Sequence, residues 1–131
     1  MIVVADASVV AEALTGGTHA GERLAEARLM APHLIDVEFL STVRGMLLTK
    51  RITPERGKDL VAEFNGLRCT RIPMLQFAAR AMELRDNVSA YDAMYVALAE
   101  WLGVPLVTTD ARLAGAPGIK ATVEVVPVST D

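Results

Sequence analysis

The strongest constraint on the fold is a short apolar run that leads directly into a carboxylate. Residues 2–5 (IVVA) form this run, Asp6 follows it, and residues 7–14 have the pattern of a short helix. The same order recurs where residues 105–109 (PLVTT) precede Asp110 and a helical turn. Buried strands that alternate with helices are typical of a parallel sheet covered on both faces. We therefore predict that Asp6 and Asp110 lie at the carboxyl edge of that sheet, where ligands bind.

The remaining segments alternate between helical and extended patterns. We predict helices at 18–29, 33–50, 74–86, 89–102 and from Pro54 onward, and further strands at 67–72 and 123–128. An apolar stripe in the helix at 89–102 includes Tyr91, Tyr95 and Trp101, which predicts that these side chains are core. The predicted fold is a single α/β domain over residues 1–131, with a mostly parallel sheet of four or five strands and helices on both faces.

Composition limits the setting of this domain. No apolar stretch approaches the roughly 18 residues that a membrane span needs, so we predict a cytoplasmic protein without a membrane partner. The single Cys69 excludes an internal disulfide, and His19 and His33 have no partner at ligand spacing, which disfavours zinc. The net charge of −3 becomes +1 when four carboxylates are set aside for a metal ion, so nucleic acid stays open as a partner.

Three of four candidate acids have a second explanation as helix caps. Asp6 and Asp110 each precede a helical segment, and Asp is a preferred N-cap residue. Asp92 stands three residues after Ser89, in the S-x-x-[DE] pattern of a capping box. From these residues alone, capping and a shared site both stay open.

The fourth acid, Glu38, lies inside a predicted helix and is not a cap. Asp36 is about 200° away around that helix, so the two carboxylates cannot face one site. Ser41, Thr42 and Gly45 share the Glu38 face and leave space beside it, which favours Glu38 over Asp36. A solvated helix acid is the alternative for Glu38.

Four segments together resemble the PIN-domain ribonucleases, and closely the VapC toxins of bacterial and archaeal toxin-antitoxin pairs. The segments, which span essentially the whole chain, are DASVVAE, APHLIDVE, SAYDAMYVALAEWLG and PLVTTDARL. The resemblance implies a PIN-like fold, Mg²⁺ or Mn²⁺ as cofactor, RNA as substrate, a homodimer, and a VapB-like antitoxin as partner.

The resemblance also implies an active site, formed by Asp6, Glu38, Asp92 and Asp110, with Thr108 and Ser8 in supporting positions. Because Ala111 and Arg112 follow Asp110, where some nucleases of the group have another acid, one or two metal ions stay possible.

Clustered carboxylates repel one another unless a cation neutralises them, and oxygen ligands suit Mg²⁺. A bound ion would activate a water for hydrolysis of a phosphodiester without a covalent intermediate. We assign Asp6 and Asp92 as metal ligands, with Glu38 and Asp110 completing the shell or ordering its waters. Arg112, two residues after Asp110, is a candidate for phosphate contact, and a solvated surface arginine is its alternative.

The predicted hairpin over residues 33–66 carries two further features. Basic side chains that could follow an RNA backbone, or alternate with acids on solvated faces, are Arg44, Lys50, Arg51, Arg56 and Lys58. Apolar side chains that could contact an antitoxin peptide, or simply pack in the core, are Met46, Leu47, Leu48, Val61, Phe64 and Leu67.

Other functions fit less well. A Rossmann-type domain needs glycines after its first strand, where this chain has Asp6, Ala7 and Ser8. A phosphotransfer domain with Asp6 as nucleophile lacks a second acid two residues on and a lysine after the late strand. A non-catalytic module that keeps the PIN fold is disfavoured because all four acidic positions are filled.

Overall fold

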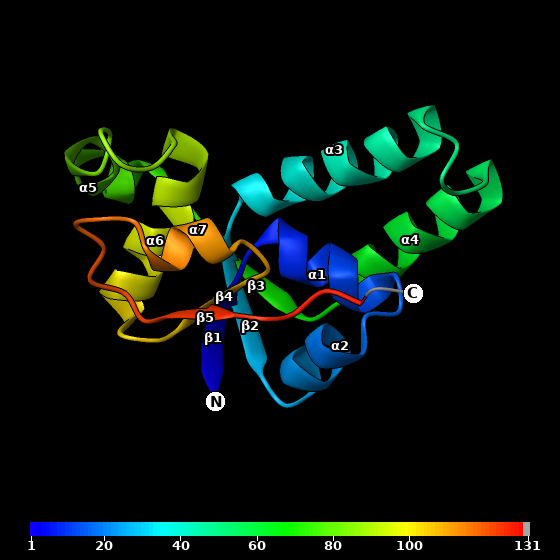
Figure 1. Cartoon of the computed structure of the whole chain (residues 1–131), viewed down its shortest axis with the longest axis horizontal. Helices are drawn as coiled ribbons and strands as arrows, with labels where there is room; N and C mark the ends of the chain where they lie inside the picture. The colour runs from blue at the N-terminus through cyan, green and yellow to red at the C-terminus, as the bar shows by residue number, and fades with distance from the viewer. Residues whose placement is uncertain (130–131) are drawn as a thin grey trace.

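The computed structural model describes residues 1–129, and within them a five-stranded, entirely parallel sheet forms the centre (Figure 1). Its strands in chain order are β1 (Ile2–Ala5), β2 (Arg28–Pro32), β3 (Cys69–Ile72), β4 (Leu106–Thr108) and β5 (Val123–Val125). In space their order is β3-β2-β1-β4-β5. The predicted parallel α/β architecture is confirmed.

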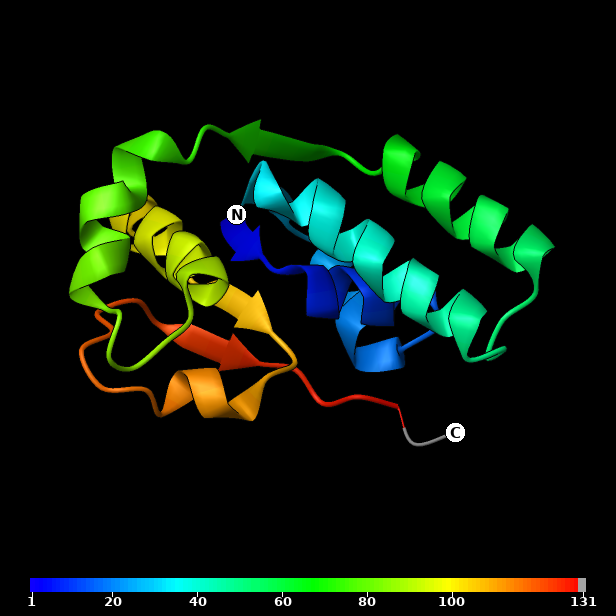
Figure 2. The same cartoon turned by 90° about the horizontal axis from the view of Figure 1, so that it is seen from above.

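Helices fill the crossovers between these strands. The elements before β3 are α1 (Ala7–Leu14), α2 (Thr18–Ala25), α3 (Leu34–Leu48) and α4 (Pro54–Gly66). Those after it are the 3₁₀ turn η1 (Leu75–Phe77), α5 (Ala78–Glu83), α6 (Ala90–Leu102) and α7 (Ala111–Ala114). Figures 1 and 2 show α1 to α4 grouped on one side and α5 and α6 on the other. The sheet is therefore covered on both faces.

The direction of the crossovers reverses between β1 and β4. From β1 the chain proceeds through β2 to β3 at one edge, and it then returns through α6 to β4 and on to β5 at the other edge. Such a reversal leaves a crevice beyond the carboxyl ends of the two central strands. Asp6 and Asp110 follow β1 and β4 respectively, so both lie at this crevice.

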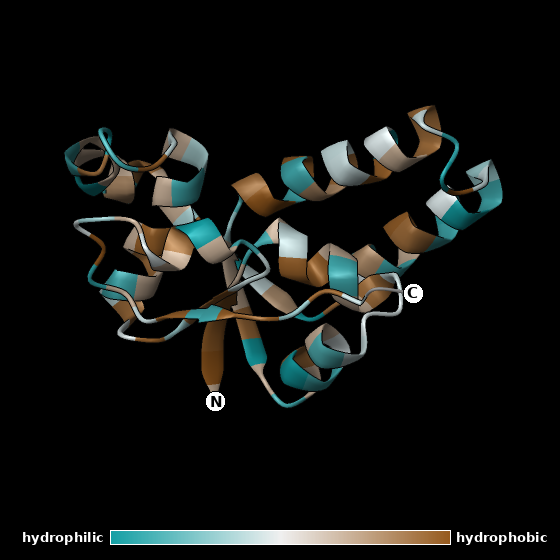
Figure 3. Ribbon diagram, viewed as in Figure 1, coloured by the Kyte–Doolittle hydropathy of each residue, from teal (hydrophilic) through white to brown (hydrophobic). Residues whose placement is uncertain are grey.

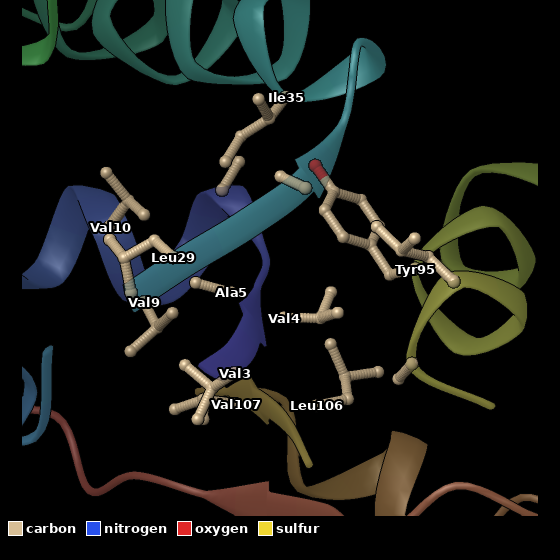
Figure 4. Packing of buried hydrophobic residues seen from close by; sticks show 14 of the residues in the cluster. Val3, Val4, Ala5, Val9, Val10, Leu29, Ile35, Tyr95, Leu106 and Val107 are labelled. Atoms are coloured by element: carbon tan, nitrogen blue, oxygen red, sulfur yellow. The ribbon is translucent and has the colours of Figure 1, made fainter. Parts of the chain in front are cut away.

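The core is built on β1, whose residues Val3, Val4 and Ala5 are all fully buried. Figure 3 shows β1 as hydrophobic along its length, and Figure 4 shows Val3 and Val4 packed with side chains from β4. A central parallel strand is apolar on both faces because helices cover both. The charge at Asp6 therefore comes where the strand leaves this core.

β2 corrects the predicted helix over residues 18–29, which ends at Ala25. Pro32 is the last residue of this strand and does not open the next helix. Leu, Met and Ala favour helices in isolation. However, Leu29 and Ala31 are buried while Arg28 is exposed, which is the two-residue period of a strand. Pairing with β1 and β3 on both sides outweighs the local preference.

Two predicted apolar faces also need correction. Tyr91 and Trp101 are 61% and 63% exposed, so they are not core, whereas Tyr95 is buried as predicted. On α3, the buried side chains are Ile35, Phe39 and Val43. The helical spacing of apolar residues in the sequence predicts a different face, and two of its members, Val37 and Leu40, are exposed; the predicted face consists of Leu34, Val37, Leu40, Val43 and Leu47. Several turns of these helices are apolar on more than one side, so periodicity alone could not select the buried face.

The apolar hairpin residues divide between core and surface. Phe64 is buried and stacks on Phe39 with ring centroids 4.1 Å apart, whereas Leu48 is 64% exposed. His19 and His33 are exposed, and Cys69 is a partly buried free thiol. Within residues 1–129, no helix has both the length and the apolar character to cross a membrane.

Candidate active site

A cavity of about 460 Å³ lies at the crevice between β1 and β4. Its walls come from the four helices α1, α3, α6 and α7 or their caps, and its lining residues are Asp6, Ala7, Ser8, Glu38, Ser41, Thr42, Asp92, Tyr95 and Asp110. All four acids of the predicted site thus border one space, although up to 104 positions separate them in the chain. Asp36 does not line this cavity; its carboxylate pairs with Arg71 at 2.9 Å.

Asp6 is the most buried of the four acids, with 8% exposure. Its Oδ1 accepts hydrogen bonds from the Ser8 hydroxyl at 2.6 Å and from the Val9 N–H at 3.1 Å. Its Oδ2 accepts a hydrogen bond from the buried hydroxyl of Thr108. Asp6 is therefore both the N-cap of α1 and a wall of the cavity, so the two explanations of this residue hold together.

Ser8 and Thr108 also form hydrogen bonds with the backbone at the end of β4. The Ser8 oxygen accepts a hydrogen bond from the Thr109 N–H at 3.1 Å, and the Thr108 oxygen accepts one from the Asp110 N–H at 3.0 Å. The carboxyl ends of β1 and β4 are therefore joined through side chains as well as through the sheet.

Glu38 projects from α3 and is held by a partner that the sequence did not point to. The hydroxyl of Tyr95, on α6, donates a hydrogen bond of 2.6 Å to Glu38 Oε1. Tyr95 is buried and lines the cavity, and Figure 4 shows its ring reaching away from α6 with the hydroxyl at its far end. Helical periodicity placed Tyr95 correctly in the core, but no pattern in the sequence indicates that its oxygen meets Glu38.

Asp92 and Asp110 complete the acidic wall. Asp92 lies in the first turn of α6, where its N–H donates to the N-cap hydroxyl of Ser89 at 3.1 Å. Asp110 caps α7 by accepting the Arg112 N–H at 3.0 Å, and the Arg112 guanidinium also contacts its carboxylate at 3.3 Å. Arg112 lines an adjoining cavity of about 270 Å³, which shares Asp92 and Asp110 with the first one.

The acids perturb one another electrostatically. Burial raises the pKa of Asp6, Glu38 and Asp92 above their ordinary values. Repulsion adds to each increase in pKa: Asp6 and Asp92 act on Glu38, Asp92 acts on Asp6, and Asp110 acts on Asp92. The pKa of Asp110 is instead lowered, chiefly by its hydrogen bond from Arg112. Three neighbouring carboxylates whose charged forms are disfavoured in this way would be stabilised by a bound cation.

Comparison with known proteins identifies the family. The PIN domain family matches residues 3–119, most of the chain. The chain belongs to the PIN-domain family. Ribonuclease VapC9 of Mycobacterium tuberculosis is 38% identical over 126 residues, covering 96% of this chain and 99% of the relative. Ribonuclease VapC12 of the same species is 37% identical over 128 residues, covering 95% and 99%. The PIN domain described here is therefore of the VapC ribonuclease type.

Solved structures agree with this fold. VapBC2 from Rickettsia felis, solved bound to a DNA fragment from its promoter, aligns with a TM-score of 0.71 and 15% identity over 96% of this chain and 99% of the other. VapC20 of M. tuberculosis, described as a sarcin-ricin loop cleaving toxin, aligns with a TM-score of 0.65 and 20% identity over 95% and 99%. At these identities the likeness concerns the fold alone.

The donor set of this PIN domain fits a hard divalent cation, but its carboxylates are not gathered into a finished metal centre. Within residues 1–129, no three His, Cys, Asp or Glu side chains already form a group that could hold a metal ion. Oxygens of Asp6, Glu38 and Asp110 accept hydrogen bonds from neighbouring side chains instead. Mg²⁺ needs only one or two direct carboxylates and keeps several waters, so the cavity suits it without closer approach of all four acids.

Proposed function

We propose that this VapC-type PIN domain is a Mg²⁺-dependent endoribonuclease and the toxin of a toxin-antitoxin pair. The observation that carries the metal dependence is the convergence of four carboxylates from separate elements on one cavity, three of them with raised pKa values. Mn²⁺ has the same ligand preference and is expected to substitute for Mg²⁺. The ribonuclease activity of the curated relatives supports RNA as the substrate.

Each acid has a defined part in this proposal. Asp6 and Asp92 hold the ion, because they border the same cavity and repel each other. Glu38 and Asp110 complete the shell or orient its waters. Ser8 and Thr108 fix the orientation of the Asp6 carboxylate by donating hydrogen bonds to it. The bound ion supplies an activated water and neutralises charge on the phosphate.

Arg112 is the proposed phosphate contact. Its side chain is 92% exposed and its guanidinium bonds Asp110 through single, rather long contacts of 3.3 and 3.4 Å. A guanidinium held this loosely is free to turn toward a phosphate that enters the neighbouring cavity. This contact would position the RNA backbone without reading its sequence.

The proposed partners are an antitoxin of the VapB type and a second copy of the chain. The alignment with the VapBC2 complex supports a toxin that is bound by an antitoxin. The homodimer rests on membership of the family. We expect size-exclusion chromatography with light scattering to show twice the mass of 14.0 kDa for the chain without antitoxin.

Asp6→Asn tests the proposed chemistry. The substitution keeps the shape of the side chain and the capping of α1, since Asn is as good an N-cap as Asp. It removes one negative charge from the site. We expect Mg²⁺-dependent cleavage of a single-stranded RNA to fall by more than the roughly 10–100-fold that loss of an outer partner of a metal site costs.

The matched control is Asp36→Asn, which also neutralises an aspartate but one outside the cavity. We expect near wild-type cleavage from this variant. Retention of full cleavage by a folded Asp6→Asn protein, free of contaminating nuclease, would overturn the assignment. Metal binding by wild type without any RNA cleavage would instead favour the non-catalytic module.

A further inference from the structure

We propose that Tyr95 is a positioning residue of this site, which fixes the Glu38 carboxylate in the orientation required for metal binding. The inference rests on the proposed metal-dependent function and adds a residue to it. Tyr95 is not acidic and lies one helical turn after Asp92, on the same helix α6. Tyr95 borders the cavity although the residue as a whole is only 1% exposed.

The geometry restricts Glu38 in a way that its own helix does not. Glu38 is half-buried on α3 and has three rotatable side-chain bonds, so an unrestrained carboxylate would sample several positions. The hydrogen bond of 2.6 Å from Tyr95 holds one carboxylate oxygen and leaves the other available. The Tyr95 ring cannot move with Glu38, since it is packed among buried core side chains (Figure 4).

Tyr95 also connects Glu38 with the segment that carries Asp6. Burial and the hydrogen bond to Glu38 raise the pKa of the Tyr95 phenol, and the backbone N–H of Ala7, the residue after Asp6, opposes this rise. Ala7 borders the same cavity. The hydroxyl thus lies between the β1–α1 junction and α3, where it sets the position of Glu38 relative to Asp6.

Tyr95→Phe tests this role, because it keeps the buried ring and removes only the hydroxyl. Outer partners of metal ligands typically contribute about 10–100-fold to affinity or activity. We expect Mn²⁺ affinity, measured by calorimetry on the protein without RNA, to fall about 10-fold. We also expect kcat for RNA cleavage to fall, with KM nearly unchanged. Tyr91→Phe, the same substitution at an exposed position of α6, is the control and should bind Mn²⁺ like wild type.

A double-mutant cycle shows whether Tyr95 acts through Glu38. In a Glu38→Ala background the hydroxyl has no carboxylate to hold, so Tyr95→Phe should cause no further loss of Mn²⁺ affinity. Thermal unfolding of each variant reports on packing separately. The inference is overturned if Tyr95→Phe binds Mn²⁺ within twofold of wild type, or if its effect is undiminished without Glu38.

The same titrations distinguish this inference from the proposed function. Wild type that binds Mn²⁺ while Asp6→Asn does not, together with an unaffected Tyr95→Phe, would overturn the role of Tyr95 alone. Wild type and Asp6→Asn with equal Mn²⁺ affinity would overturn the metal site itself, and with it the role of Tyr95.

Discussion

At the scale of the residue, Asp6 shows how a cap and a functional group can be one side chain. Capping alone would need only the hydrogen bond from the Val9 N–H. The two hydroxyl donors and the repulsion from Asp92 belong to the cavity instead. Burial of a carboxylate is unfavourable, and hydrogen bonds offset this only in part. The fold therefore holds a charge at Asp6 that is unfavourable until a cation neutralises it.

The pH dependence of stability should reveal this unfavourable charge. Burial raises the pKa of Asp6 above its ordinary value of 3.8, despite hydrogen bonds that lower it. The folded state therefore binds more protons than the unfolded state above pH 3.8, so the free energy of unfolding falls as the pH rises through that window. For the metal-free protein at neutral pH, we expect Asp6→Asn to increase the free energy of unfolding by on the order of 1 kcal/mol.

Urea unfolding at several pH values would measure this effect. The advantage of Asp6→Asn should shrink as the pH is lowered toward 3.8, where the wild-type carboxyl becomes protonated in both states. An Asp6→Asn protein that is less stable than wild type at neutral pH would show that the Asp6 carboxylate stabilises the fold, contrary to this expectation.

The residue scale also shows what the sequence can and cannot predict about a site. Asp6, Asp92 and Asp110 were predictable because each occupies a recognisable junction between strand and helix or a helix start. Glu38 was separable from Asp36 because helix geometry puts them on different faces. Tyr95 was not predictable as a site residue, since its contact with Glu38 depends on how α6 and α3 are placed across the sheet.

At the scale of the element, α5 and α6 are joined by an ion pair that is largely shielded from water. Arg80 contacts Glu100 at 2.7 Å, and these side chains are 24% and 14% exposed. Glu100 also accepts the Lys120 N–H at 2.8 Å, and Arg80 donates to the Gly118 carbonyl at 2.9 Å. The pair therefore anchors the loop before β5 as well as the two helices.

Glu100→Gln should destabilise the protein by about 1–3 kcal/mol, since hydrogen bonds to charged groups contribute roughly that much. The matched control is Glu63→Gln, because Glu63 and Arg56 form an ion pair with side chains that are 43% and 39% exposed. Exposed pairs contribute about 0–1 kcal/mol. Equal losses of stability in the two variants would contradict the importance of shielding.

The contribution of Glu100 to stability should also depend on pH. Although burial alone would raise the pKa of Glu100, hydrogen bonds from Arg80 and from the Lys120 N–H lower it below 4.5. This contribution to stability is therefore present above pH 4.5 and is lost as the pH falls through the lowered pKa. The thermal unfolding midpoints of wild type and Glu100→Gln, measured without denaturant, should converge at acidic pH.

Strand β2 marks the limit of prediction at this scale. Its neighbour β1 is an apolar run (IVVA) and the segment of β3 (CTRI) mixes apolar and polar residues, whereas residues 28–32 (RLMAP) have a composition compatible with a helix. Their extended conformation comes from pairing with strands that begin 26 residues earlier and 41 residues later, at Ile2 and Cys69. Local sequence patterns do not contain this information.

At the scale of the whole molecule, the site depends on the order of the strands. Asp6 and Asp110 are brought together because β1 and β4 are neighbours at the centre of the sheet, although 100 residues separate Ser8 from Thr108 in their shared hydrogen-bonded network. Glu38 and Asp92 approach from helices on opposite faces. An intact sheet with both helical layers is therefore needed to form the cavity.

Metal binding should consequently stabilise the whole fold. A ligand that binds only the folded state at 100 times its dissociation constant adds about 2.7 kcal/mol to the free energy of unfolding. We expect saturating Mg²⁺ to raise the thermal midpoint of wild type and to leave that of Asp6→Asn nearly unchanged. The thermal midpoints of the metal-free proteins are measured in Ca²⁺-free EDTA buffer. An equal rise of the midpoint in both proteins would indicate a general salt effect.

The exposed position of Trp101 gives the molecule a built-in optical reporter. It is the only tryptophan of the chain, and it is 63% exposed. Its indole packs edge-on against the Phe77 ring, with the ring centroids 5.8 Å apart. The wavelength of its fluorescence emission maximum should accordingly change little when the core unfolds. Its fluorescence intensity and anisotropy should instead report on the contact between η1 and α6. Separation of these two elements can therefore be measured independently of the unfolding of the core.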